Sequence, residues 1–229
     1  MDRPVISVII PVYNESKGLE ALFALLAPFK NRCEIIFVDG GSSDGTAELI
    51  EEQGGLVLRS QKGRANQMNF GAAAARGEVL WFLHADSAPP SDALSQILDV
   101  LGRGYRIGCF RIRFCSRHPF MAIHAWMSNN LRLRILNIAF GDQGIFMERA
   151  LFDELGGYAP IPLMEDYKLS MDAGKAGYSI GIARGAITTS DRRYQAGGRL
   201  RTMWRMQVLQ RRFRRGDSVE EIAKAYNQR

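Results

Sequence analysis

The chain has 229 residues, of which 46% are hydrophobic and 24% are charged, and its formal net charge is +6. This length and apolar fraction predict one compact domain and exclude a disordered or low-complexity protein. No apolar window approaches the roughly 20 residues that span a bilayer. Residues 1–4 lead directly into a short strand instead of a signal peptide, which predicts a cytoplasmic protein.

The first hundred residues alternate between strand-like and helix-like segments. Apolar strands are predicted at residues 6–11, 35–39, 56–58 and 78–83, and helices at 18–29, 47–53 and 67–75. Crossovers between parallel strands bring every carboxyl end to one edge of the sheet. The order therefore predicts an α/β fold with a mostly parallel sheet, helices on both faces and a ligand cleft at that edge.

Polar residues follow three of the predicted strands, where they should line this cleft. They are Tyr13, Asn14, Asp39, Asp44 and Asp86. The two glycines after Asp39 let a ligand approach the backbone, and the Asp39 carboxylate can accept a hydrogen bond from a base or a ribose. An ordinary strand-to-helix turn is the alternative for this loop by itself, because it has neither the GxGxxG spacing nor a Walker lysine.

Two arginine-rich segments carry the excess positive charge. Residues 103–134 contain seven arginines, residues 192–215 contain nine, and neither segment contains an acid. The remaining residues are therefore net acidic, as a metal-binding site can be. In the second segment, apolar residues near helical spacing predict a basic amphipathic helix: Leu200, Met203, Trp204, Val208 and Phe213. Such a helix either packs its apolar stripe on the domain or lies on an anionic membrane surface. Nucleic acid is not an expected partner, because no nucleic-acid-binding motif accompanies the charge.

Five motifs resemble, in order, those of family 2 glycosyltransferases. They are Pro-Val-Tyr-Asn-Glu (11–15), Val-Asp-Gly-Gly-Ser-Ser-Asp-Gly-Thr (38–46), Lys-Gly-Arg-Ala-Asn-Gln-Met-Asn (62–69), Phe-Leu-His-Ala-Asp (82–86) and Glu-Asp (165–166). The resemblance covers roughly residues 1–190 and depends on the order of the set. Later pieces at 140–146, 162–166 and 190–193 are most similar to the subgroup of radical-SAM/selenodomain-associated transferases, type 2.

This resemblance implies a GT-A fold, with a Rossmann-like sheet in a single glycosyltransferase domain over residues 1–229. Residues 1–100 would form the nucleotide-binding half, 101–190 the acceptor half and 191–229 a basic helical segment. The implied reaction is inverting transfer of a sugar from a nucleoside-diphosphate donor, UDP in preference to GDP, to an acceptor hydroxyl. A lipid-linked or membrane-proximal acceptor would place the protein at the inner face of the membrane.

The resemblance also implies the residues of the donor site. The nucleotide-sugar set is Pro11, Val12, Tyr13, Asn14, Glu15, Asp39, Gly41, Arg64, Asn69, His84, Ala85 and Asp86. Asp86 is the expected ligand of a divalent cation, Mn²⁺ or Mg²⁺, because such ions accept one protein carboxylate together with diphosphate and water. The family's usual Asp-x-Asp reads His84-Ala85-Asp86 here, which makes His84 a candidate second ligand.

The acceptor side follows from the later motifs. By resemblance, Asp166 is the general base, with Glu165 beside it in the catalytic pair; without the family context, a helix amino-terminal cap would explain these two acids. Gly141, Asp142 and Gln143 are assigned to the acceptor side, where Asp142 can hydrogen-bond hydroxyl groups. Arg192 and Arg193 are assigned to the diphosphate, which guanidinium groups bind bidentately.

Two alternative functions remain to be weighed against the transferase. A nucleotidyltransferase is disfavoured, because Pro-Val-Tyr-Asn-Glu occupies the place of its glycine-rich, arginine-containing loop. A catalytically silent nucleotide-sugar or membrane-surface binding module is favoured by the missing first acid of the metal motif.

Overall fold

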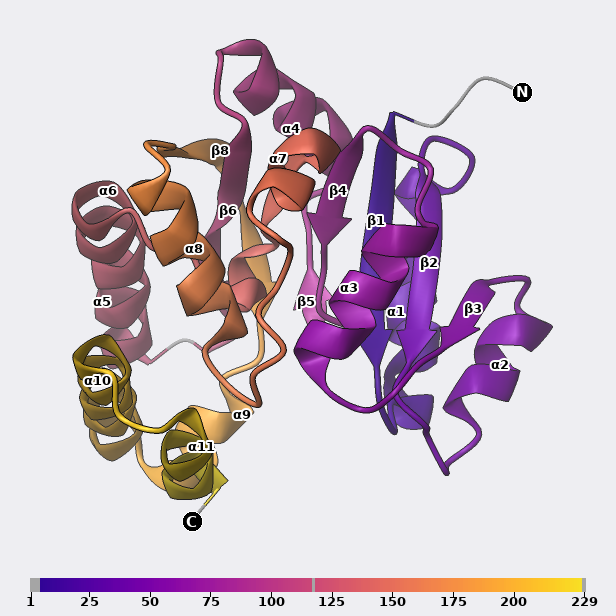
Figure 1. The fold of residues 1–229 in the computed structure, drawn as a ribbon. Coiled ribbons are helices and arrows are strands. Elements are labelled where there is room, and N and C mark those ends of the chain that lie inside the picture. Colours follow the sequence, from indigo (N-terminus) through magenta and orange to yellow (C-terminus); the bar gives the residue numbers. More distant parts are fainter. Residues whose placement is uncertain (1–4, 117, 228–229) are drawn as a thin grey trace.

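The computed structural model describes residues 5–116 and 118–227. Its centre is an eight-stranded sheet in the order β3-β2-β1-β4-β7-β6-β8-β5 (Figure 1). The strands are β1 (Ile6–Val12), β2 (Glu34–Asp39), β3 (Leu56–Arg59), β4 (Val79–Phe82), β5 (Ser87–Ala88), β6 (Ile107–Phe114), β7 (Phe146–Glu148) and β8 (Ile180–Thr189). Neighbouring strands among β3, β2, β1 and β4 are parallel, and β6 is parallel to β8. Strand β7 is antiparallel to both β4 and β6, and β5 is antiparallel to β8. The predicted mostly parallel sheet is confirmed.

Helices connect the strands and cover both faces of the sheet. They are α1 (Leu19–Leu26), α2 (Thr46–Glu52), α3 (Arg64–Ala74), α4 (Ala93–Gly102), α5 (Pro119–Met127), α6 (Leu133–Leu136), α7 (Arg149–Glu154), α8 (Glu165–Lys175), α9 (Arg192–Gly197), α10 (Arg199–Arg215) and α11 (Val219–Asn227). Short 3-10 turns precede and follow α1 at Ser16–Gly18 and Ala27–Phe29, and a third lies at Gly141–Gln143. A π-helical turn, Ser128–Arg132, joins α5 to α6.

Alternate side chains of β1 enter two different cores, because successive residues of a strand point to opposite faces. Val8 and Ile10 pack with residues of α1, α2 and α4. Ile9, between them, packs with residues of α3, α7 and α8. Figure 1 shows α3, α7 and α8 on the near side of the sheet and α1 on the far side. An apolar run without alternation is thus the expected sequence of a strand that is buried on both faces.

The carboxyl-terminal helices pack on α8. Their shared core contains Tyr167 of α8, Leu209 and Phe213 of α10, and Ile222 of α11, and the Tyr167 and Phe213 rings meet edge to face at 5.9 Å. The predicted basic helix is therefore present as α10. Its predicted apolar stripe is divided, because Phe213 faces inward whereas Trp204 is exposed. No described helix combines the length and the apolar character needed to cross a membrane.

Helix α3 approaches the sheet closely at Gly71. A Cβ atom placed there would lie 2.6 Å from Cγ2 of Ile9 and 2.9 Å from Cγ2 of Val38, both on strands. Because these distances are shorter than ordinary carbon contacts, a side chain at this position would push α3 away from β1 and β2. The amino-terminal end of α3 borders the carboxyl edge of the sheet, so this packing also positions the candidate site.

We expect Gly71→Ala to lower the free energy of unfolding by about 1–3 kcal/mol through overpacking, although alanine has the higher helix propensity. Gly102→Ala in α4 is the matched control, because a Cβ atom there would meet nothing within 4 Å. Urea unfolding of both variants measures the difference. Equal stabilities of the two variants would contradict the close packing of α3.

Candidate active site

Asp39 ends β2 and organises the glycine turn that follows it. Its Oδ2 accepts hydrogen bonds from the backbone N–H groups of Gly41 at 2.9 Å and Ser42 at 3.0 Å, and its Oδ1 accepts from the Ser42 hydroxyl. Gly41 has a φ of +85°, a conformation that a glycine adopts without steric cost. The carboxylate, only 3% exposed, therefore fixes the shape of the loop at the edge where the sequence predicts a nucleotide.

The loop after β1 is joined to the loop after β2 through Asn14. The Asn14 N–H donates to Oγ of Ser42, and its side-chain oxygen accepts from the Ser43 N–H, both at 2.9 Å. Asn14 itself has a φ of +55°, which asparagine tolerates better than most residues. The two predicted donor loops consequently form one hydrogen-bonded unit.

A second pair of hydrogen bonds joins the same loops further out. Glu15 donates its N–H to Oγ1 of Thr46 at 2.9 Å, and Ser16 donates its N–H to Oδ2 of Asp44 at 3.1 Å. Hydrogen bonds from the Thr46 hydroxyl and from Ser16 hold the pKa of Asp44 well below its usual range. The Asp44 carboxylate therefore stays ionised, and its two oxygens accept the hydrogen bonds from Ser16 and from the Thr46 hydroxyl.

Gln67 is a site-supporting residue that the sequence analysis did not assign. Its buried side-chain amide donates to the backbone carbonyls of Val12 and Val38, each at 2.8 Å, where β1 and β2 approach the site. Without this amide the two carbonyl groups would lose a partner in a dry environment, which is costly. In the sequence, only the position of Gln67 within the 62–69 motif indicated that it has a role at the site.

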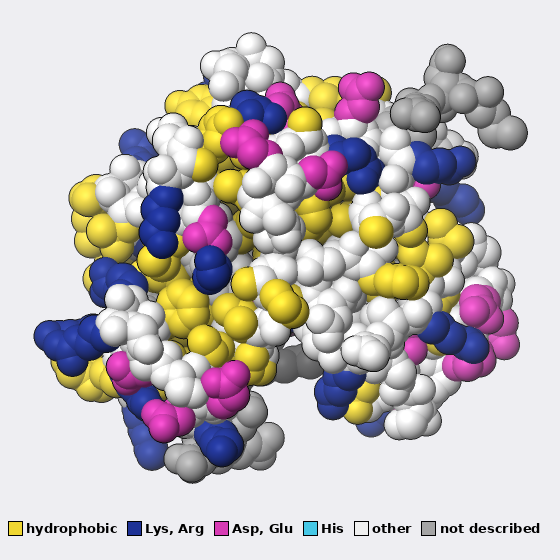
Figure 2. Space-filling view, in the orientation of Figure 1, with side chains coloured by type: hydrophobic (Ala, Val, Ile, Leu, Met, Phe, Trp, Pro, Cys, Tyr) yellow, Lys and Arg dark blue, Asp and Glu magenta, His cyan; other side chains and the backbone are white. Residues whose placement is uncertain are grey.

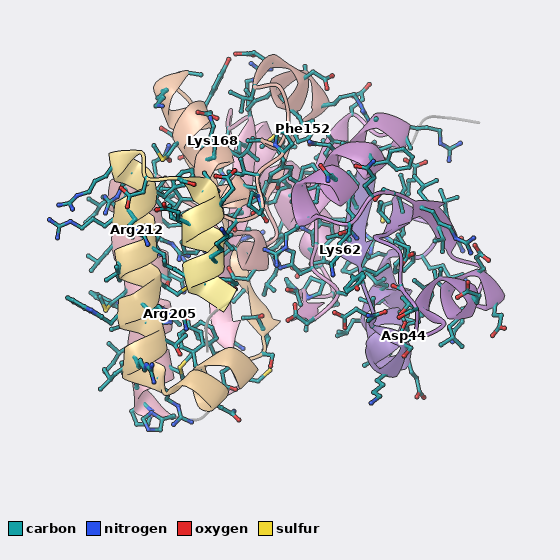
Figure 3. All side chains as sticks on the ribbon, turned by 60° about the horizontal axis from the view of Figure 1, so that its bottom comes forward. Asp44, Lys62, Phe152, Lys168, Arg205 and Arg212 are labelled. Atoms are coloured by element: carbon teal, nitrogen blue, oxygen red, sulfur yellow. The ribbon has the colours of Figure 1, made fainter. Side chains whose placement is uncertain are left out.

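Tyr13 lies at the open edge of the same loops. Tyr13 is 39% exposed, and Nζ of Lys62 lies 3.9 Å from the centroid of its ring. Figure 3, which brings the carboxyl edge of the sheet forward, shows Lys62 on this edge together with Asp44. The pair presents an aromatic face and a cation, and Lys62 is a second residue that the sequence analysis left without a role.

Arg64, the first residue of α3, pairs with the first residue of α8. Its Nη1 lies 3.2 Å from Oε1 of Glu165, and the two side chains are 45% and 3% exposed. Burial lowers the pKa of Arg64, but attraction to Glu165 and Asp166 outweighs this and raises it. Burial and the neighbouring Asp166 raise the pKa of Glu165, which Arg64 partly offsets. The Arg64 side chain thus remains partly exposed while its Nη1 pairs with the buried acid.

His84 and Asp166, which the sequence placed in different halves, meet at Gly141. The Gly141 N–H donates to Oδ2 of Asp166 at 2.7 Å. A Cβ atom on Gly141 would lie 2.5 Å from Nε2 of His84, which is too close, and 3.4 Å from Oδ2 of Asp166, which is an ordinary contact, so a side chain there would displace His84. Asp166 lies in the first turn of α8, whose N-cap residue is Met164. The cap explanation for the Glu-Asp pair therefore does not apply, although both acids lie where a helix favours negative charge.

Three carboxylates repel one another around this junction. Burial raises the pKa of Asp142 to about 6; Arg132 opposes the shift, and the charges of Asp166 and Asp86 add to it. Oδ1 of Asp142 is buried without a hydrogen-bond partner among the described residues. Among those residues, no three His, Cys, Asp or Glu side chains form a cluster that could hold a metal ion by themselves. An exposed Asp86 beside this negative charge suits a cation that takes most of its ligands from elsewhere.

Two predicted site residues have their side chains engaged in holding the backbone. Gln143 is fully buried and donates Nε2 to the Phe110 carbonyl at 3.2 Å, while its Oε1 accepts from Nη2 of Arg132 at 2.5 Å. Asn69 makes hydrogen bonds of 2.7 and 2.9 Å with the backbone of Tyr158. These contacts give Gln143 and Asn69 a role in holding the backbone around the site, and their assignment to ligand binding stays a prediction.

The diphosphate assignment of two arginines falls on side chains outside the described part of the structure. Only the backbone of Arg192 and Arg193, at the start of α9, is described.

Arg132, which the sequence placed only within a charged segment, reaches the site from the π-helical turn. Its guanidinium carbon lies 3.8 Å from the centroid of the Phe140 ring. A π-helical turn is a feature often found at functional sites.

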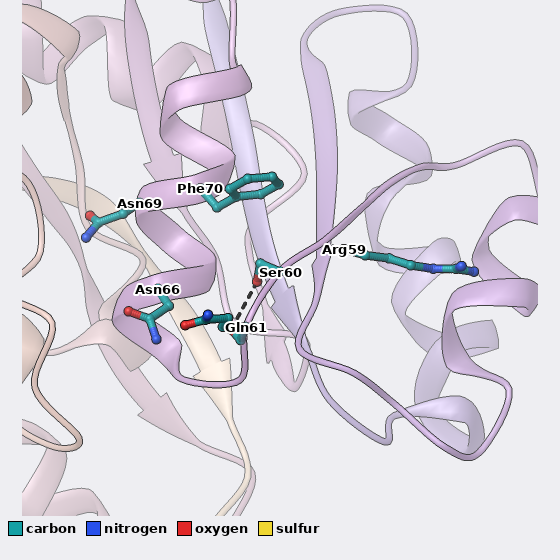
Figure 4. A pocket seen from close by; sticks show the side chains of 6 residues that line it. All are labelled: Arg59, Ser60, Gln61, Asn66, Asn69 and Phe70. Atoms are coloured by element: carbon teal, nitrogen blue, oxygen red, sulfur yellow. Dashed lines mark hydrogen bonds between the residues drawn. The ribbon is translucent and has the colours of Figure 1, made fainter.

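A separate open groove of about 740 Å³ lies along α3. Figure 4 shows its lining, which comes from β3, the following loop and α3: Arg59, Ser60, Gln61, Asn66, Asn69 and Phe70. Of the predicted site residues, only Asn69 lines it. The groove contains none of the site carboxylates, so the chemistry predicted from the sequence belongs to the strand-end edge instead.

The sheet order and the strand-end loops define an open α/β fold with its candidate ligand site at the carboxyl ends of parallel strands. The family model described as "Glycosyl transferase family 2" matches residues 7–156. The chain belongs to this family, as its motifs predict.

Two curated relatives illustrate the sequence similarity. The probable glycosyltransferase YdaM of Bacillus subtilis is 29% identical over 233 residues, which cover 89% of this chain and 55% of that protein. The undecaprenyl-phosphate 4-deoxy-4-formamido-L-arabinose transferase of Aeromonas hydrophila is 29% identical over 118 residues, covering 46% of this chain and 36% of that protein. The chain thus spans about half of the first relative, and its match covers about a third of the second.

Two solved structures show the same fold at low identity. Residues 1–349 of S. aureus TarS, in complex with UDP-GlcNAc, give a TM-score of 0.62 at 18% identity, covering 81% of this chain and 58% of that one. Glucosyl-3-phosphoglycerate synthase from Mycobacterium tuberculosis, in complex with Mn²⁺, UDP-glucose and phosphoglyceric acid, gives 0.61 at 18% identity, covering 81% and 71%. These likenesses confirm the predicted GT-A fold.

We expect Asp44→Asn to weaken the affinity for a nucleoside diphosphate by about three- to tenfold, because the amide removes acceptors that join the two loops. Glu48→Gln is the matched control, since its exposed pair with Arg59 contributes little. Isothermal titration of both variants measures the effect. Because the pKa of Asp44 is lowered, its carboxylate is ionised at and above the ordinary aspartate pKa of about 4. The difference in affinity between the native protein and Asp44→Asn should therefore persist there and disappear only as the pH falls through the lowered pKa. Equal affinities of the two variants would contradict a loop role for Asp44.

Proposed function

We propose that the protein transfers a sugar from a nucleoside-diphosphate donor to an acceptor hydroxyl, with inversion at the anomeric carbon. The observation that carries this proposal is the junction at Gly141, where Asp166 and His84 meet beside Asp86 and Asp142. It brings the candidate base next to the strand end that follows the donor loops. We treat residues 1–100 as the donor half, 101–190 as the acceptor half and 191–229 as the basic segment of one domain.

The donor nucleotide would bind at the carboxyl edge between the loops of β1 and β2. Pro11 to Glu15 would flank it, with the exposed Tyr13 ring as a stacking surface. Asp39 would act mainly by fixing the glycine turn, and the exposed part of Arg64 would contact the base or a phosphate. UDP is favoured over GDP, and the two similar folds named above were solved with UDP-sugars.

The residues fit a divalent cation, Mn²⁺ or Mg²⁺, bound by few protein ligands. Asp86 would supply a carboxylate and His84 a second ligand, with Ala85 between them. The fit is supported by the unpartnered Oδ1 of Asp142 and by the repulsion between Asp142 and the two neighbouring acids. Such an ion supplies positive charge that stabilises a departing diphosphate.

Asp166 would remove the proton of the acceptor hydroxyl. The hydroxyl oxygen forms a bond to the anomeric carbon as the bond to the diphosphate oxygen breaks, and the proton moves to Asp166. The Gly141 N–H holds Oδ2 of Asp166 in place, and Glu165 is held by Arg64. Asp142 would hydrogen-bond acceptor hydroxyls, and Arg192 and Arg193 would add positive charge at the diphosphate.

A lipid-linked acceptor is the finer proposal. The name of one relative includes undecaprenyl phosphate. Of the two arginine-rich segments without acids, one lies within the acceptor half and the other follows it. The motifs at 140–146, 162–166 and 190–193 support the narrower subgroup of radical-SAM/selenodomain-associated transferases. A catalytically silent binding module stays the alternative, because His84 replaces the first acid of the metal motif.

We expect isothermal titration to detect UDP binding that is tighter than GDP binding and requires Mn²⁺ or Mg²⁺. Asp86→Ala should weaken metal-dependent binding at least about tenfold, since a carboxylate ligand is lost. Asp99→Ala in α4 is the matched control, because its carboxylate makes only an exposed contact of 3.9 Å with Arg103. No binding of either diphosphate would overturn the donor site.

We expect Asp166→Asn to lower the rate of donor hydrolysis or transfer by about 10²- to 10⁴-fold, because the amide cannot accept the acceptor proton. Donor affinity should change little. Asp172→Asn, on the same helix and paired with the exposed Lys168, is the matched control. Full activity of Asp166→Asn would remove this residue from the reaction, and donor binding without turnover of any acceptor would favour the silent module.

A further inference from the structure

Exposed apolar side chains gather on two segments that are far apart in the sequence. The described residues include fifteen large hydrophobic side chains that are exposed, and nine of them lie on α5 to α6 or on α10. These nine are Ile123, Trp126, Met127, Leu131, Ile135, Leu136, Leu200, Trp204 and Val208. Trp126 is 58% exposed, Ile135 70% and Trp204 71%. A monomeric protein rarely leaves so many large apolar groups together in water.

The two segments are neighbours in the fold. His118 and Phe120, at the start of α5, line one pocket together with residues 198–201 at the start of α10. In Figures 1 and 3, which differ by a rotation about the horizontal axis, α5 and α10 both lie at the left edge of the molecule. We call the exposed residues of 119–136 and 199–215 the α5–α10 face.

Exposed arginines surround these apolar groups. They are Arg134, Arg201, Arg211, Arg214 and Arg215, and among the described residues none of them has a carboxylate within ion-pair distance. Neither segment contains an acid. Figure 2 shows hydrophobic and basic side chains next to one another along the left edge, over α6 and α10. The face therefore combines apolar groups with uncompensated positive charge.

We propose that the α5–α10 face binds the surface of a membrane that contains anionic lipids. Helices with exposed apolar and basic side chains lie in the interface, where the apolar groups enter the boundary of the acyl chains and the arginines contact phosphate groups. Tryptophans such as Trp126 and Trp204 favour this interface, because their rings are apolar and their N–H groups are polar.

The chemistry of the face favours an anionic membrane over the two other partners that such a face could bind, a second copy of the chain and nucleic acid. A symmetric contact with a second copy would bring arginine-rich surfaces against each other without acids to pair them, and like charges disfavour that arrangement. Nucleic acid would match the arginines but not the aliphatic Ile135, Leu136 and Leu200, because bases stack on aromatic and guanidinium planes.

The same segment also reaches the candidate site. Leu131 is 40% exposed on the outside, whereas Arg132, the next residue, points to Gln143 and influences the pKa of Asp142. A membrane on the outer side would therefore contact the segment that supplies Arg132 to the candidate site, an arrangement that suits a membrane-bound acceptor. The link to an acceptor rests on the proposed function, but the membrane contact does not.

Three tryptophans make the test direct. Trp81 is fully buried, so the emission changes on membrane contact must come from Trp126 and Trp204. The protein, without nucleotide, is mixed with phosphatidylcholine vesicles with or without phosphatidylglycerol. We expect co-sedimentation and a blue shift of the emission only when phosphatidylglycerol is present.

Two variants and matched controls locate the contact. Trp204→Ser combined with Ile135→Ser, and Arg201→Gln combined with Arg211→Gln, should each weaken vesicle binding by at least about tenfold. Leu98→Ser and Arg184→Gln, which alter exposed residues outside the face, should not. Each variant is checked by circular dichroism and by titration with UDP, so that loss of the fold or of the donor site is detected separately.

Several outcomes would overturn the proposal. They are absence of binding to anionic vesicles, equal binding by all variants, and equal binding to vesicles without phosphatidylglycerol. A doubling of mass in light scattering that the face variants abolish would assign the face to a second copy instead. Tight, salt-sensitive binding of single-stranded nucleic acid without vesicle binding would assign it to nucleic acid.

Discussion

The parallel alignment of β1, β2 and β4 is the constraint on which the rest of the structure depends. It forces crossover helices onto both faces and brings the polar ends of all three strands to one edge. Loops at such an edge contain backbone groups that need partners. Gln67 satisfies two carbonyls, and Asp39 and Asp44 accept from neighbouring N–H groups. The residues that most resemble ligand-binding groups therefore first make the loops rigid.

The antiparallel strand β7 joins the two halves of the site. It pairs with β4 on one side and β6 on the other, so the segment that precedes it, including Gly141, lies beside the end of β4. Close contact between Gly141, His84 and Asp166 follows from this pairing. The negative charge collected there is balanced in part by Arg64 and Arg132, which come from opposite halves. An acidic centre between two guanidinium groups is well suited to a ligand that carries phosphates and a cation.

Residues 119–136 have different chemistry on their two sides. Inward, Arg132 supports Gln143 and the Phe140 ring; outward, Ile123, Trp126 and Ile135 are exposed. Helix α10 continues the outward side, while its inner residues pack on α8. The segment 119–136 thus contributes both to the exposed face and to the surroundings of the candidate site.

The sequence by itself determined the fold class, the succession of strands and helices along the first hundred residues and the family, because buried parallel strands and polar strand ends leave strong local patterns. Only the tertiary structure decided which polar groups are already used. Gln143 and Asn69 have side chains that suit ligand binding, but backbone groups distant in the sequence occupy them. The meeting of His84 with Asp166, and of α5 with α10, also depends on contacts between remote segments. Local patterns encode which face of an element is apolar, whereas its partner is set by how the whole chain packs.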